Sequence, residues 1–82
     1  MPLVGGALGV VSPLAARVAR ILDEERVAQG ITQVRLARSA EVSQSQLSKM
    51  LRAERNINLT QLERLCIALG LRLAEVVREA SA

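Results

Sequence analysis

The chain has 82 residues, half of them hydrophobic, and a net charge of +3, which suits one small domain. It contains no aromatic residue, and this argues against a surface that stacks single-stranded bases. It contains one cysteine and no histidine, so we expect no metal site, no Cys–His or Ser–His nucleophile pair, no cofactor and no enzymatic activity.

The first eleven residues form an apolar arm that carries no charged side chain. Without Lys or Arg the arm cannot hold phosphates, and without a basic start or a cleavage site it is not a convincing signal peptide. A loose apolar arm favours association, so we predict that it packs against a second subunit. Packing on its own domain is the alternative. The expected dimerisation residues are Leu3, Val4, Leu8 and Val10 in the arm, with Val77 and Ala80 on the last helix as the other candidate surface.

Leucine and alanine are good helix formers, and long β-branched runs are absent, so residues 12–82 are predicted to form an all-α domain. Start and stop signals divide this domain into five helices. We expect these helices from Ser12-Pro13 to Gly30, over about 32–39 after Thr32, from Ser43 to a loop that begins at Ala53, from Asn58 to Gly70, and from Leu73 to about Glu79.

Each predicted helix has an apolar stripe at helical spacing. The expected core residues include Leu14, Val18, Ile21, Leu22, Leu36, Ala37, Ala40, Leu47, Met50, Leu51, Leu59, Leu62, Leu65, Cys66 and Leu69. Two Ser/Asn-x-x-Gln patterns predict capping boxes, Ser43 with Gln46 and Asn58 with Gln61. We interpret Cys66 as a small buried apolar residue, and a lone cysteine fits a reducing cytoplasm.

The net charge of the chain comes from residues 31–58, which contain five basic and two acidic residues. The segments before and after contain equal numbers of basic and acidic residues. A local basic excess on a helical segment is typical of duplex-DNA binders. The third helix has short polar residues near its start, opposite its apolar stripe, as a reader of the major groove needs. We expect base contacts from Gln44, Ser45, Ser48 and Lys49, and DNA backbone contacts from Gln33, Ser43, Arg52, Arg55 and Asn56.

These polar residues also have plainer interpretations. The four expected base contacts could form an ordinary solvated helix face, and Arg52 and Arg55 could serve solubility alone. Arg35 and Arg38 on the second helix suit phosphate contact and exposure to solvent equally well. The remaining arginines lie in charge-balanced regions and are interpreted as surface or ion-pair residues.

Residues 14–77 resemble the lambda-repressor and Cro type of helix-turn-helix proteins, also called XRE-like. The matching residues are Gly30-Ile31-Thr32-Gln33, Leu36-Ala37, Val42-Ser43-Gln44-Ser45, Leu47-Ser48-Lys49-Met50, Arg55-Asn56 and Leu59 to Gly70. The resemblance implies a five-helix domain with an apolar N-terminal arm (residues 1–11), a helix-turn-helix over about 32–52, and binding to a palindromic operator as a homodimer.

Three positions depart from the family pattern. Glu41 stands at the turn position that is usually Gly, which predicts a non-glycine residue at positive φ. Leu51-Arg52-Ala53 replaces the frequent Glu-Asn-Gly, which allows a different loop and a longer third helix. Arg72 replaces the usual small cap before the last helix.

The sequence therefore predicts a cytoplasmic, homodimeric, sequence-specific regulator that binds double-stranded DNA, most like a small phage Cro repressor. No membrane and no small-molecule ligand are expected as partners. Two alternatives stay open. The chain could be the antitoxin of a toxin–antitoxin pair, with the arm binding the toxin, or a protein-interaction module that keeps the fold without binding DNA.

Overall fold

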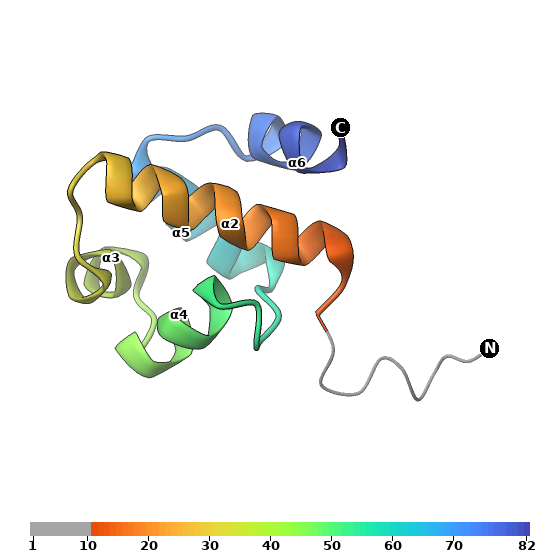
Figure 1. Cartoon of the computed structure of the whole chain (residues 1–82). Coiled ribbons are helices and arrows are strands. Elements are labelled where there is room, and N and C mark those ends of the chain that lie inside the picture. Colours follow the sequence, from red (N-terminus) through yellow and green to blue (C-terminus); the bar gives the residue numbers. More distant parts are fainter. Residues whose placement is uncertain (1–10) are drawn as a thin grey trace.

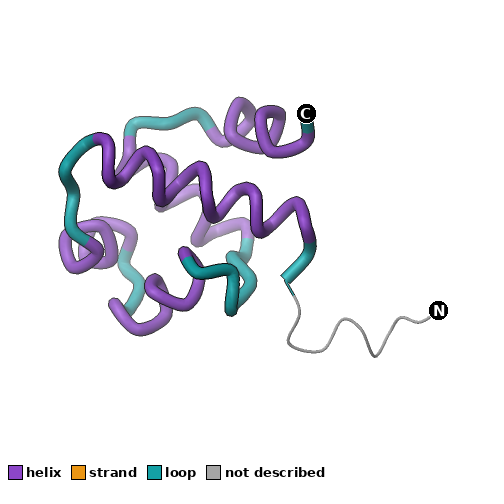
Figure 2. The backbone as a smooth tube through the Cα atoms, in the orientation of Figure 1, coloured by secondary structure: helices purple, strands orange, loops and turns teal. Residues whose placement is uncertain are grey.

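The computed structural model describes residues 11–82 of the chain. This part folds into five α-helices without a strand (Figures 1 and 2): α2 (Pro13–Ala28), α3 (Gln33–Ala40), α4 (Gln44–Leu51), α5 (Leu59–Leu69) and α6 (Leu73–Ser81). The all-α, five-helix prediction is confirmed. Residues 1–10 lie outside the described part, and with them the expected dimerisation residues Leu3, Val4, Leu8 and Val10.

Four of the five helices begin at a side chain that accepts a hydrogen bond from the backbone N–H three residues on, as their sequences predict. These pairs are Ser12 with Ala15, Thr32 with Arg35, Ser43 with Gln46, and Asn58 with Gln61. Gln61 also bonds back to the Asn58 amide, which completes that capping box. The box predicted at Ser43 is wrong in its second half, because only the Ser43 hydroxyl bond forms. Arg72 precedes α6 without a side-chain cap.

A residue with a left-handed backbone conformation (positive φ) follows the end of each of four helices. Gly30 and Gly70 take φ of 70° and 72°, while Glu41 and Ala53 take φ of 60° and 59°. The positive φ predicted for Glu41 is therefore confirmed. A longer third helix does not form, because α4 ends at Leu51 and Ala53 already turns the chain. Two non-glycine residues thus hold a backbone conformation that costs about 1–2 kcal/mol each for an L-residue.

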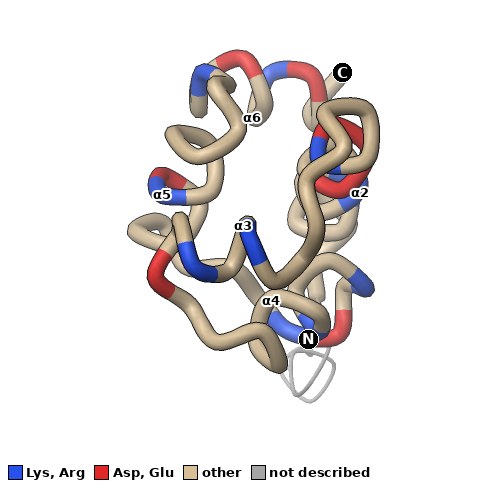
Figure 3. The backbone as a smooth tube through the Cα atoms, turned by 90° about the vertical axis from the view of Figure 1, so that its left-hand side faces the viewer, with Lys and Arg blue, Asp and Glu red and all other residues tan. Residues whose placement is uncertain are grey.

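The long helix α2 runs through the middle of the molecule (Figure 1). It contacts α6 on one side and α4 on the other, while α5 packs against α2, α3 and α6. Helices α6 and α4 lie at opposite ends of the molecule in both views (Figures 1 and 3). This arrangement leaves one face of α4 on the outside, far from α6.

The helices enclose a core built from aliphatic residues and the one cysteine. Its members are Val18, Leu22, Leu36, Ala37, Ala40, Leu47, Leu62, Leu65, Cys66, Leu69, Val76 and Ala80. Burial raises the pKa of the Cys66 thiol, as expected for a structural cysteine. Between residues 11 and 82, no helix combines the length and apolar character needed to cross a membrane.

Three core and surface expectations are wrong. Leu59 is 71% exposed, because it lies at the first position of α5, where no other helix covers it. Leu14 is also only partly covered, at 39% exposure. Ala80 was expected on the outer face of the last helix, but it is 1% exposed, since that side of α6 packs on α2.

Replacing Glu41 with glycine is expected to stabilise the fold. Glycine adopts positive φ without steric cost, so Glu41→Gly should raise the free energy of unfolding by about 1 kcal/mol. The control Glu41→Ala removes the carboxylate and keeps the strain, so it should change stability by less than about 0.5 kcal/mol. Urea unfolding followed by circular dichroism measures both. Equal values for the two variants would contradict a net gain from relieving the positive φ.

Candidate nucleic-acid interface

Helix α4 separates an inner face from an outer one. Leu47 and Met50 are completely buried against the rest of the domain, and Leu51 is half-buried. On the opposite side of the helix, the structure brings together all four residues that the sequence predicts as base contacts. Gln44, Ser45 and Lys49 are exposed, and Ser48 is half-buried. This outer face of α4, residues 44, 45, 48 and 49, is called the reading face below.

Helix α3 contacts α4, and its start offers free backbone donors. The Thr32 hydroxyl accepts the Arg35 amide at 3.1 Å, which is the third N–H of the helix. The first two amides, of Gln33 and Val34, have no partner within the helix, and the helix dipole adds positive character there. Gln33 itself is half-buried at this end. A phosphate could therefore be held by backbone and side chain together.

The remaining predicted backbone contacts flank α4. Ser43 is exposed just before the helix, and its hydroxyl caps the helix at 3.1 Å from the Gln46 nitrogen. Arg55 and Asn56 are exposed in the loop between α4 and α5. All three are exposed and flank α4 in the sequence.

Arg52 is already occupied by neighbouring side chains. Its Nε donates to Glu54 Oε2 at 2.9 Å and its Nη2 to Glu54 Oε1 at 3.2 Å, while its Nη1 donates to the Ser48 hydroxyl. The hydrogen bond with Arg52 is the main reason that the pKa of Glu54 lies below its ordinary value, and the same bond raises the pKa of Arg52. Glu54 was missed from the sequence, although its place two residues after Arg52 was a visible signal.

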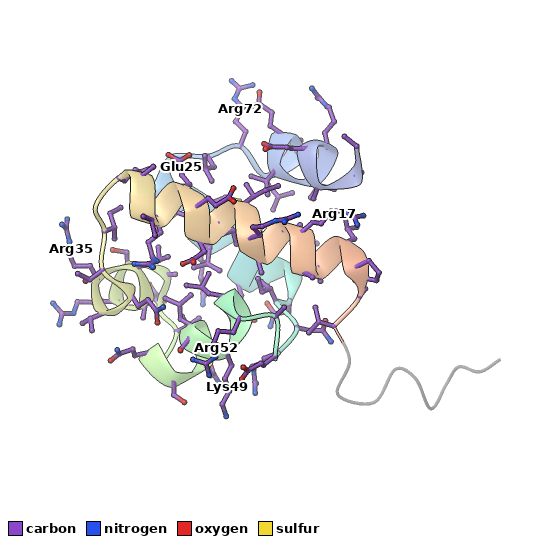
Figure 4. The ribbon with its side chains drawn as sticks, viewed as in Figure 1. Arg17, Glu25, Arg35, Lys49, Arg52 and Arg72 are labelled. Atoms are coloured by element: carbon purple, nitrogen blue, oxygen red, sulfur yellow. The ribbon has the colours of Figure 1, made fainter. Side chains whose placement is uncertain are left out.

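The four other basic residues of 31–58 are exposed: Arg35, Arg38, Lys49 and Arg55. Lys49 points away from the body of the molecule beneath α4, and Arg35 points outward from α3 (Figure 4). Glu41 approaches a cation of the neighbouring α5, Arg64, at 3.9 Å. Basic positions therefore accumulate along α3 and beside α4 (Figure 3), where they can attract a polyanion.

The opposite side of the molecule carries no such basic excess. The charged residues that line a groove between α2 and α6, beside apolar ones, are four glutamates and one arginine, Arg72. These glutamates are Glu24, Glu25, Glu75 and Glu79. Residues 13–28 and 72–81, which form this side, contain as many arginines as acidic residues, so the basic excess along α3 and α4 favours contact with a polyanion there.

Other candidate residues lie away from this surface. Val77, expected at a dimer interface, is half-buried beside Leu14, Ile57 and Leu62. Two apolar residues of α5 were not predicted as surface contacts, yet Leu59 and Ile67 are 71% and 73% exposed. Across residues 11–82, no group of three or more His, Cys, Asp or Glu side chains is arranged to hold a metal ion.

A family model described as helix-turn-helix matches residues 22–76, which include α3, α4 and α5 completely. The solved structure of a clp gene regulator, ClgR, from Corynebacterium glutamicum is similar to the chain, with a TM-score of 0.75 and 30% identity. The match covers 85% of this chain and 90% of that one.

Two other solved structures are similar. The restriction-modification controller protein C.AhdI from Aeromonas hydrophila has a TM-score of 0.70 and 28% identity, covering 77% of this chain and 94% of that one. A hypothetical transcription factor, NHTF, from Neisseria has a TM-score of 0.73 and 27% identity, covering 83% and 79%. No functionally curated protein sequence matches the chain.

Removing the Arg52 guanidinium is expected to release Glu54. In Arg52→Gln the pKa of Glu54 should rise toward its ordinary value of 4.5, because its main hydrogen-bond donor is lost. The folded pKa of Glu54 is lowered, so the stability that the pair adds is present above that ordinary value and is lost as the pH falls through the folded pKa. The titration of the Glu54 carboxyl carbon by NMR measures the change.

The matched control is Arg55→Gln, which removes an exposed cation of the same loop that does not pair with Glu54. It should leave the Glu54 titration unchanged. An equal rise in both variants would mean that the general charge of the loop, not the hydrogen bond, sets this pKa.

Proposed function

Because the chain belongs to the helix-turn-helix family, we propose that it is a sequence-specific regulator that binds double-stranded DNA as a homodimer. In this proposal it represses transcription by occupying a palindromic operator, in the manner of a small Cro-type repressor. The observation that carries the proposal is the reading face: four polar side chains on the outside of a helix whose other side is fixed in the core.

The reading face suits the major groove in size and chemistry. An α-helix with its side chains is about 10–12 Å across, and the groove is about 12 Å wide. Gln44 can form two hydrogen bonds with adenine, and Lys49 can donate to O6 and N7 of guanine. Ser48 accepts from Arg52, so its own hydroxyl proton is left to donate to a base acceptor. Ser45 completes the set as a short donor or acceptor.

Phosphate contacts would set the register of α4 in the groove. We assign them to Gln33 with the free amides at the start of α3, to Ser43, and to Arg55 and Asn56 in the loop. Arg52 joins this set only by exchanging Glu54 for a phosphate. In the structure Arg52 bonds to Glu54 and to the Ser48 hydroxyl, so we assign it mainly to positioning Ser48.

The outer face of α5 supports the homodimer better than Val77 does. Leu59 and Ile67 lie eight residues apart on α5 and are the two most exposed large apolar side chains of residues 11–82. A shallow hollow at the start of α5 is lined by Leu59, Thr60, Glu63 and Leu73. A two-fold interface brings the same patch of both subunits together, so Ile67 of each copy could fill the hollow of the other.

Similar proteins support a regulatory role. Proteins at 27–30% identity are described as a gene regulator, a restriction-modification controller and a hypothetical transcription factor. The Cro-type repressor and its palindromic operator are proposed from the resemblance of the sequence and from the reading face.

Truncation of the reading face should reduce specific binding. Gln44→Ala and Lys49→Ala are each expected to cost roughly 1–3 kcal/mol on a duplex selected by the wild-type protein from a random pool, and little on random duplexes. The matched control is Arg72→Ala, which removes an exposed cation from the opposite side of the molecule (Figure 4) and should change neither affinity. Gel-shift titrations at fixed salt give these values.

The possible failures of this experiment are distinct. Equal losses on selected and random duplexes would demote Gln44 and Lys49 to phosphate contacts. The absence of binding to any duplex would contradict the proposed function and favour a protein-interaction module.

A charge on the outer face of α5 should break the dimer. Ile67→Asp places an unpaired carboxylate at the centre of the proposed interface, so sedimentation should show a monomer where the wild type shows a dimer. The control Val27→Asp alters an exposed side chain of α2 (61% exposed) and should leave the dimer intact. A dimer that survives Ile67→Asp would exclude this face.

A further inference from the structure

A second apolar feature lies at the point where the described chain begins. Leu14 of α2, Ile57 of the loop before α5, Leu62 of α5 and Val77 of α6 line a groove of about 160 Å³. Ser12, the residue that caps α2, also lines the groove. Three of the lining side chains leave part of their apolar surface in water, since Leu14 is 39% exposed and Ile57 and Val77 are half-buried.

The chain itself supplies a fitting occupant. Residues 1–10 precede the groove directly and contain no charged side chain, with apolar residues at Leu3, Val4, Leu8 and Val10. Leu8 lies four residues before Ser12, and a chain of that length spans at most about 14 Å. Leu8 can therefore reach the groove that Ser12 helps to line, without a long closing loop.

We propose that the N-terminal arm docks in the groove of its own domain, with the Leu8 side chain against Leu14, Ile57 and Val77. This occupant covers apolar surface that the five helices leave open, at little entropic cost because the loop that it closes is short. The charge of the groove agrees, since the residues that line it are apolar except for Ser12.

The position of Ile57 gives this docking a consequence. Ile57 directly follows Arg55 and Asn56 in the loop after α4, and packs against the core. An arm that packs against Ile57 would restrict the movement of the loop that carries Arg55 and Asn56. The arm then acts as a brace within one subunit, in contrast to the strap between subunits that its composition alone favoured.

The docking is tested first by stability. Leu8→Asp, which cannot fill an apolar groove, is expected to lower the Tm of the full chain by about 4–8 °C in circular dichroism. The matched control Gly5→Asp adds the same charge to the arm without removing an apolar side chain, and should leave the Tm unchanged. Equal melting of the two variants would overturn the proposal.

Concentration separates docking within a subunit from docking between subunits. The effect of Leu8→Asp should be the same at low and high protein concentration, and the mass in solution should not change, because a contact within one chain does not depend on mass action. A Tm loss that grows with concentration, or a dimer lost in Leu8→Asp, would overturn the proposal in favour of a strap to the second subunit.

A double-mutant cycle then places the Leu8 side chain. Leu14→Ser removes one wall of the groove at a partly exposed position, so Leu8→Asp should have a smaller effect in that background than in the wild type. Fully additive effects would mean that Leu8 docks elsewhere and would overturn the assigned groove.

The lack of aromatic residues provides a direct probe that does not depend on stability. Leu8→Trp and Gly5→Trp each introduce the single fluorophore of the chain. The emission of Leu8→Trp should be shifted to shorter wavelength than that of Gly5→Trp, and the shift should vanish in denaturant. Identical native spectra for the two variants would contradict the docking.

Discussion

The burial of Leu47 and Met50 is the constraint on which the candidate surface depends. Helix α4 has only eight residues, and isolated helices shorter than about 12–15 residues are marginal in water. The helix therefore exists because its inner face is packed on α2 and α3 and because Ser43 caps its start. That packing also sets the rotation of α4 about its axis, so the burial of Leu47 and Met50 decides which side chains form the reading face.

Electrostatics adds direction to this geometry. The basic excess of residues 31–58 is not spread evenly, because Glu54 engages Arg52 and Glu41 lies near Arg64. The cations left exposed are on α3, on α4 and in the following loop, while glutamates line the groove between α2 and α6. Exposed ion pairs add little to stability, so this arrangement matters for the approach of a partner more than for the fold.

The sequence predicted what local chemistry decides. The side-chain caps at Ser12, Thr32 and Asn58, the glycines that follow α2 and α5, and the positive φ of Glu41 each depend on a few adjacent residues. The structure contains all of them. Periodicity also placed the reading face opposite Leu47 and Met50. Periodicity does not show which part of an apolar stripe is covered by another helix. For this reason Leu59 was predicted in the core and Ala80 on the surface. The bonds of Arg52 were missed because they depend on side-chain conformations, which spacing leaves undetermined.

The central claim is that the outer face of α4 enters DNA while α6 stays away from it. Backbone amide shifts of the isotope-labelled protein, followed by NMR while a duplex is added, test this most directly. The largest changes are expected at residues 43–49 and at the start of α3, with little change over residues 73–81. Changes centred on α6, or on the groove between α2 and α6, would contradict it.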